Sequence, residues 1–258
     1  MTTSPSALAL RADTPSARAP IPFARLVRIE WAKATDTRSA RWLLAVVVLT
    51  TVGLMAVPVV VPTSFEQTYA TYLRVAALGM TILLPVVAIL LLTGEWSHRT
   101  VITTFTQEPR RLRVLGAKVA ASAGMGAGAA VLGGVLAAAA IGVAAASGRT
   151  FEADLNLAAV VGYVLFVLLN VLAGVALGAL LQSSAIAIAA SFALPAGFAV
   201  LGTASTLVSD WIDTSSAWTA VLEADWSGHL PQIAFSIAFW VAVPLALGAV
   251  RTVRRDIG

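Results

Sequence analysis

Few residues of this chain are of a type and spacing that could break or form covalent bonds. The two histidines, His98 and His229, are separated by several hydrophobic segments that place them on opposite sides of a membrane. Cysteine is absent, which excludes disulfides and thiolate metal sites. The sequence contains neither an H-E-x-x-H zinc motif nor a G-x-x-x-x-G-K-[ST] phosphate loop. These patterns predict a non-catalytic chain that holds no metal and no cofactor.

A charged partner could dock on the segment 94–118, GEWSHRTVITTFTQEPRRLRVLGAK. This segment holds the residues best suited to such binding. Glu95 stands at the end of a hydrophobic run, where it could form a salt bridge with a nearby arginine. Pro109 interrupts the segment, and a basic cluster follows it. The segment is long enough for two short helices beneath a membrane. The candidate interface residues are Glu95, Arg99, Thr100, Pro109, Arg110, Arg111 and Arg113.

A second informative segment precedes the first hydrophobic run. Over residues 22–42, apolar side chains recur near i, i+3, i+4 and i+8, and the basic residues lie mostly off this stripe. The pattern predicts an amphipathic helix in the inner membrane interface, with its basic residues near anionic headgroups. Lipid anchoring alone explains it, and contact with a partner protein is an equal alternative. The predicted apolar stripe consists of Phe23, Leu26, Val27 and Trp31.

The elements that must position these segments are transmembrane helices. Hydrophobic residues make up 59% of the chain and charged residues only 12%, against about 25% charged in soluble domains. Spanning a bilayer takes about 20 predominantly apolar residues. We therefore predict an all-α membrane protein with one transmembrane domain over residues 22–258, preceded by a disordered cytoplasmic tail over residues 1–21. The six predicted spans are 42–61, 72–93, 119–146, 155–181, 184–208 and 230–250.

The distribution of basic residues predicts the orientation of these spans. All but two of the 17 Lys and Arg residues fall on one side, and the exceptions are Arg74 and Arg149. Because positive charge favours the cytoplasmic side, both termini are predicted to be cytoplasmic. The same distribution argues against nucleic acid as a partner, since the basic residues flank membrane spans instead of forming a phosphate-binding face.

Inside the spans, the residue types predict close contacts between helices more than catalytic or ion-binding groups. No charged residue lies deep in a predicted span, which disfavours an ion-coupled transporter. Asn170 is the most polar side chain at mid-span, and we expect it to form an interhelical hydrogen bond. Two G-x-x-x-G pairs, in residues 124–128 and 174–178, predict close packing between helices. The outer connection 209–229 carries three tryptophans among acidic residues, which predicts short interfacial helices or a loop on the outer surface.

This layout resembles the ABC-2 class of permeases, which are the membrane subunits of ATP-binding-cassette exporters. The resemblance covers residues 22–258 and includes the six spans with both ends inside. It rests on an R-I-E-W-x-K motif at Arg28, Ile29, Glu30, Trp31 and Lys33. It rests also on a loop motif at Gly94, Glu95, Arg99, Thr100, Pro109, Arg110, Arg113, Val114, Leu115 and Lys118.

The resemblance implies a partnership that composition does not reveal. The chain would pair with a second copy or a related permease in the bacterial plasma membrane. Separate ATP-binding subunits, which carry ATP and magnesium, would dock below it, and segment 94–118 would act as the coupling helix. The cargo of such an exporter would be a drug, an antibiotic peptide or a lipid. Two alternatives remain: a membrane scaffold or assembly protein without transport, and an ion-coupled secondary transporter.

Overall fold

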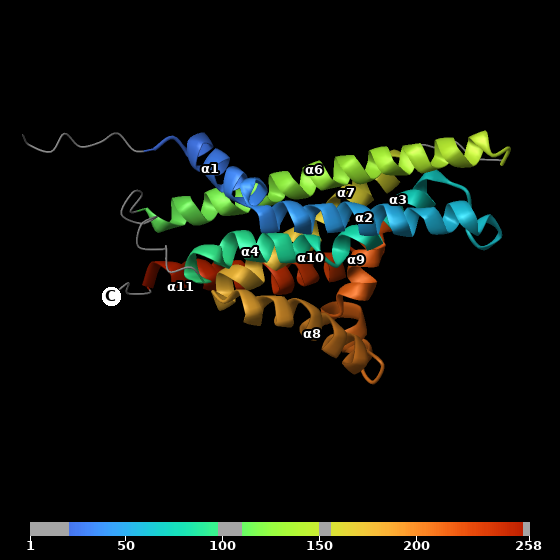
Figure 1. Ribbon diagram of the computed structural model, residues 1–258. Coiled ribbons are helices and arrows are strands. Elements are labelled where there is room, and N and C mark those ends of the chain that lie inside the picture. Colours follow the sequence, from blue (N-terminus) through green and yellow to red (C-terminus); the bar gives the residue numbers. More distant parts are fainter. Residues whose placement is uncertain (1–20, 98–109, 150–155, 255–258) are drawn as a thin grey trace, which may run out of the picture.

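The structure is a computed structural model that describes residues 21–97, 110–149 and 156–254. Within these ranges every regular element is helical. Six helical segments are long and apolar enough to cross a membrane, as the sequence predicted. They are Arg38–Val60, Tyr69–Glu95, Arg111–Ala146, Leu157–Leu181, Ser184–Gly202 and Leu230–Arg254. The chain therefore has the architecture of a multi-pass membrane protein (Figure 1). The predicted tail lies outside the described residues, except for its last residue.

The first span is preceded by a separate short helix. Helix α1 covers Phe23–Asp36, and α2 covers Arg38–Val60. Thr37 separates them in an extended conformation, and its hydroxyl accepts a hydrogen bond from the Ala40 amide at 3.2 Å. This N-cap, and not the onset of hydrophobicity, sets the start of α2, which therefore begins four residues before the predicted span.

The second span is interrupted in its middle. Helix α3 covers Tyr69–Thr81 and α4 covers Leu84–Ser97, and the two are joined by a turn. Pro85 is the second residue of α4. Because proline has no amide hydrogen, it cannot donate to the Thr81 carbonyl four residues earlier, and the helical ladder breaks there. Between α2 and α3, a short 3₁₀ turn covers Pro62–Ser64.

The third span is the longest helix described. Helix α6 covers Arg111–Ala146, which is 36 residues. At 1.5 Å per residue it extends roughly 54 Å, well beyond a hydrocarbon core of about 30 Å. The span was predicted to begin after Lys118, but the helix starts seven residues earlier. Lys118 is buried inside the protein and does not mark the end of the helix.

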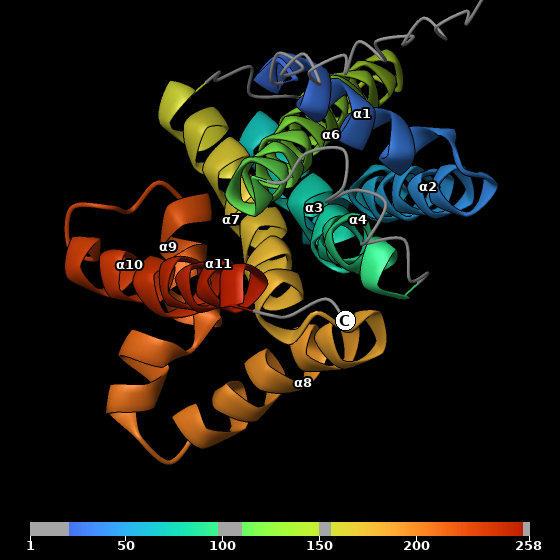
Figure 2. The same ribbon diagram turned by 90° about the vertical axis from the view of Figure 1, so that its left-hand side faces the viewer.

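Helix α7, Leu157–Leu181, lies at the centre of the bundle (Figure 2). Its glycines Gly174 and Gly178 face α4. A Cβ on Gly174 would lie 2.7 Å from the Pro85 carbonyl oxygen, and one on Gly178 would lie 3.1 Å from Leu92. This confirms close packing for the second glycine pair. In the first pair only Gly124 has a neighbour from another helix within 4 Å, the Trp31 ring, whereas Gly128 has none.

A tight turn connects α7 to α8, Ser184–Gly202, as predicted. Gln182 adopts the left-handed conformation that ends α7, with φ of 51°. Thr93 and Ser184 hydroxyls lie 2.7 Å apart and hold the start of α8 against α4. From there α8 runs along the periphery of the bundle (Figure 2). Only 6% of its most apolar stretch is buried, against 56% for α7.

The outer connection forms short helices, but one tryptophan departs from the prediction. A π-helical turn, η2, covers Val208–Ile212, and α9 covers Thr214–Leu222, capped by the Asp213 carboxylate. Trp218 is buried and donates a hydrogen bond to Ser236 at 2.8 Å. It was expected at the membrane surface and instead joins α9 to the last span. That span comprises α10 (Leu230–Ile237), the π-helical turn η3 (Ala238–Ala242) and α11 (Val243–Arg254).

The first and last described segments meet at one end of the bundle (Figure 1). The Arg113 guanidinium donates to the Ile21 carbonyl at 2.7 Å, and Arg111 donates to the Thr252 carbonyl at 3.1 Å. The start of α6 therefore lies beside the first and the last parts of the described chain. This is the arrangement that an even number of spans requires.

Candidate functional site

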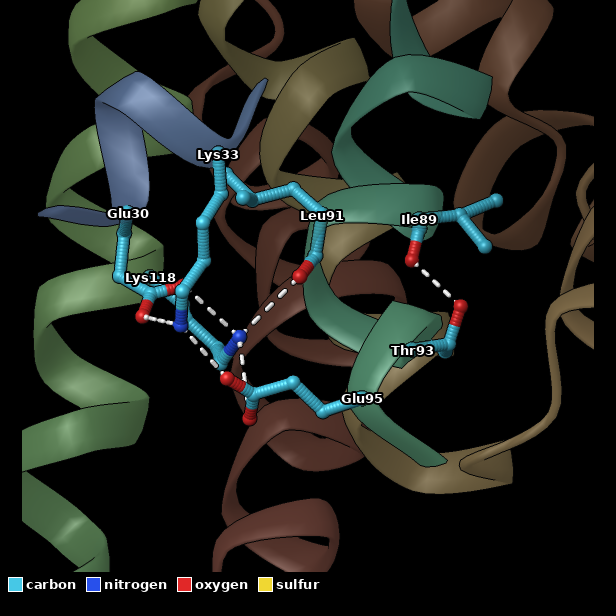
Figure 3. Close-up of polar contacts among 7 residues, drawn as sticks. All are labelled: Glu30, Lys33, Ile89, Leu91, Thr93, Glu95 and Lys118. Atoms are coloured by element: carbon cyan, nitrogen blue, oxygen red, sulfur yellow. Dashed lines mark hydrogen bonds and ion pairs between the residues drawn. The ribbon is translucent and has the colours of Figure 1, made fainter. Parts of the chain in front are cut away.

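Four charged side chains form a closed ring at the end of the bundle that holds α1 and the start of α6 (Figure 3). Lys33 Nζ lies 2.7 Å from Glu30 Oε1 and 2.7 Å from Glu95 Oε1. Lys118 Nζ lies 2.8 Å from Glu30 Oε2 and 3.5 Å from Glu95 Oε2. Positive and negative groups alternate around the ring. We call Glu30, Lys33, Glu95 and Lys118 the charge ring.

The charge ring is buried at one side and exposed at the other. The side chains of Glu30 and Lys118 are 5% and 6% exposed, whereas that of Lys33 is 42% exposed. Lys118 also donates to the Leu91 carbonyl at 3.2 Å. A buried charge is tolerated only when it is paired and hydrogen-bonded, and this pairing supplies both. With two carboxylates and two ammonium groups, the ring has no net charge.

The exposed member of the ring has an altered pKa. Partial burial alone would lower the pKa of Lys33 by disfavouring its charged form, but hydrogen bonds and attraction from Glu30 and Glu95 act in the opposite direction. The net effect raises the pKa of Lys33 above its ordinary value. Lys33 therefore stays protonated throughout the physiological pH range.

Three helices position these side chains, and each does so by ordinary helical spacing. In α1, Glu30 lies on the buried face between Leu26 and Ala34, four residues from each. In α6, Lys118 lies on a buried face that includes Val114 and Ala121. Glu95 lies near the end of α4. The ring thus joins α1, α4 and α6, which are far apart in the sequence.

The structure gives Glu95 two partners that the sequence did not reveal. Its carboxylate pairs with Lys33 and Lys118. Lys33 lies in α1, 62 residues away from Glu95 in the sequence, so no local pattern could reveal this contact. Glu30, Lys33 and Lys118 entered the sequence analysis only as members of motifs. One feature of the sequence could have indicated Lys118: it is a lysine within an apolar helical stretch.

The basic cluster lies at the start of α6, beside the charge ring. Arg110 directly precedes α6, and Arg111 and Arg113 contact the carbonyls of Thr252 and Ile21. Arg111 also lines a small pocket beside the ring, with Glu95 and Lys118. The remaining candidates, Arg99, Thr100 and Pro109, lie outside the described residues, as do residues 98–109 of the predicted coupling segment as a whole.

Part of the predicted apolar stripe of α1 packs against the rest of the protein. Leu26 is buried and Val27 is half-buried. Phe23 and Trp31 are 45% and 39% exposed, yet their rings lie against Gly116 and Gly124 of α6. The lack of side chains at these two glycines makes room for the rings. Contact with α6 therefore accounts for part of the stripe that was assigned to lipid.

Asn170 also differs from its prediction. Its amide nitrogen donates to the Phe166 carbonyl at 2.9 Å, within α7 itself. This bond is within one helix and is not the expected interhelical one. It uses one of the two amide hydrogens, so the second N–H can still donate and the side-chain oxygen can still accept.

The charge ring joins α1, α4 and α6 through ion pairs. Among the described residues, no three His, Cys, Asp or Glu side chains are grouped closely enough to hold a metal ion.

No family model matches the chain, and none of the curated proteins matches it either. The class defined by the fold is a helical, multi-pass membrane protein.

Proposed function

We propose that this chain is the permease subunit of an ATP-binding-cassette exporter in a bacterial plasma membrane. Two copies, or this chain and a related one, would form the membrane part. ATP hydrolysis would take place on separate subunits docked at segment 94–118. The permease itself would hold no cofactor, and its cargo would be a drug, an antibiotic peptide or a lipid.

The observation that carries this proposal is the position of the charge ring relative to that segment. Glu95 and Lys118 stand near its two ends and lie 3.5 Å apart at their charged groups. Both also belong to the ring that includes Glu30 and Lys33 of α1. A force applied between residues 95 and 118 would therefore reach α1, α4 and α6 together. Such a rigid connection is what transmission from an ATPase to membrane helices requires.

The arrangement also supports an external energy source. The four charges of the ring neutralise one another and lie at the end of the bundle, so they provide no unpaired group to carry a coupling ion through the membrane. Within this proposal, ATP-driven closure of the partner subunits shifts the membrane helices between inward-facing and outward-facing states.

Affinity purification of the full chain from its native membranes tests the proposal. We expect an ATP-binding subunit to be recovered with the chain, and ATP hydrolysis by the recovered complex. Arg99→Glu, in the proposed docking segment, should abolish this recovery. Arg74→Glu is the matched control, because Arg74 is one of the two basic residues predicted to lie on the opposite side of the membrane. Recovery of the wild-type chain without any ATP-binding protein would contradict the proposal and favour a scaffold.

A further inference from the structure

A cavity of about 230 Å³ lies among α4, α7, α8, α9 and the turn η3. It is larger than the engineered apolar cavities of roughly 150 Å³ that bind benzene. Its members include Pro85, Asn170 and Pro195, which lie near the middle of their respective spans. The cavity is therefore placed at the level of the hydrocarbon core.

Most of the cavity wall is apolar and aromatic. Trp218 and Trp240 both line it. Their indole nitrogens donate to Ser236 and to the Ile212 carbonyl, each at 2.8 Å. With these hydrogens already used, the two side chains offer only ring surface to a ligand. None of the described residues that line the cavity carries a formal charge.

The polar residues of the lining include hydrogen-bond acceptors. Pro85 and Pro195 cannot donate to the carbonyls of Thr81 and Ser191, four residues before them. Thr81 and Ser191 both line the cavity, as does Asn170, whose side-chain oxygen is an acceptor. The hydroxyls of Thr81 and Ser191 donate to carbonyls of their own helices. The cavity thus combines acceptors with ring surface.

A ligand can reach the cavity from the hydrocarbon core of the bilayer, and not only from water. Phe192 of α8 lines it and is 46% exposed, so the wall formed by α8 extends to the protein surface. Figure 2 shows α8 at the periphery of the bundle. In a bilayer that surface contacts lipid chains. A ligand dissolved in the membrane could therefore enter beside α8.

From these features we infer that the cavity binds an uncharged amphiphile with an apolar body and a head group that donates hydrogen bonds, such as an alcohol. The apolar body contacts the tryptophan rings, and the hydroxyl group donates to the acceptors of Asn170, Thr81 or Ser191. Anionic ligands are excluded because the lining offers no cation, and a buried ammonium would lack a carboxylate partner. Binding requires this chain alone, whether or not an ATPase is its partner.

Photolabelling of the purified full chain with a diazirine-bearing medium-chain alkanol tests the inference. Labelling should saturate, should map by mass spectrometry to Phe192 and Trp218, and should be displaced by the unlabelled alcohol. Ala173 lines the cavity, so Ala173→Leu should weaken labelling there about tenfold, which corresponds to an overpacking cost of roughly 1.4 kcal/mol. Ala193→Leu, on the exposed side of α8, is the matched control and should have no effect.

A second probe and a second variant together test the role of the hydrogen-bond acceptors. The methyl ether of the same probe cannot donate a hydrogen bond, so wild-type protein should prefer the alcohol by about fivefold, the effect of one neutral hydrogen bond. Asn170→Leu should reduce this preference while it preserves labelling by the ether. Labelling that never saturates, that spreads evenly over lipid-facing residues, or that is the same in Ala173→Leu would overturn the inference. Failure to recover an ATPase would leave it unaffected.

Discussion

The ammonium group of Lys118 lies 2.8 Å from the carboxylate of Glu30, and both side chains are almost fully buried. The pair connects α1, which precedes the first span, to α6, which forms the third. Removing one member of a buried pair leaves the other charge uncompensated, whereas removing both can be nearly neutral.

Single substitutions in this pair should therefore be strongly destabilising. We expect Glu30→Gln to lower the free energy of unfolding by about 3–5 kcal/mol. The double variant Glu30→Leu with Lys118→Met should recover much of this loss. Thermal unfolding in a mild detergent measures both. Asp36→Asn is the control, since Asp36 pairs at 3.8 Å with Arg41 in an exposed position and should change stability by less than about 1 kcal/mol.

The raised pKa of Lys33 predicts a dependence on alkaline pH. Because its folded-state pKa is higher than its unfolded-state pKa, the interaction stabilises the protein fully below the unfolded value of about 10.4. That contribution is lost as the pH rises through the folded-state pKa. Melting temperatures of wild type and Lys33→Met should differ at pH 8 and converge at strongly alkaline pH. A constant difference across this range would refute the assignment.

The glycines of the long helices should differ sharply in their tolerance of alanine. A Cβ on Gly174 would lie 2.7 Å from the Pro85 carbonyl oxygen, so Gly174→Ala should destabilise the protein by about 1–3 kcal/mol. Gly128 has open space within 4 Å, and Gly128→Ala should be neutral or stabilising by up to about 1 kcal/mol. Unfolding midpoints compare the two. Equal effects would show that α4 and α7 are not packed as described.

The Trp218–Ser236 hydrogen bond should stabilise the packing of α9 against α10. Trp218→Phe leaves the buried Ser236 hydroxyl without this donor, which should cost about 1–3 kcal/mol. Adding Ser236→Ala removes that hydroxyl and should restore part of the loss. The test is a double-mutant cycle on unfolding midpoints. Purely additive effects would argue against the bond.

The sequence predicted the spans well because hydrophobic length is a local property. All six were found, and the errors lie at ends that local hydrophobicity does not determine. Thr37 sets the start of α2 through a cap, and Pro85 divides the second span. The turn at Gln182 was found from three polar residues between two apolar runs.

The site was predicted less well because its contacts are not local. Glu30 and Lys118 are 88 positions apart, and nothing in either neighbourhood reveals their contact. The same holds for Trp218, whose amphipathic ring suggested a membrane surface while its partner, Ser236, lies in another span. Glu95 was singled out by its position at a span boundary, but its partners depend on how α1 folds back onto α6.

The separation of Glu30 and Lys118 also has a consequence for biosynthesis. At a translation rate of about 5–20 residues per second, Lys118 is made roughly 4 to 18 seconds after Glu30. During that interval α1 cannot adopt its final position, because α6 does not yet exist. The docking of α1 therefore reports that the first two spans and the start of the third have been made, and a nascent chain stalled before residue 118 would expose this helix to quality-control proteases.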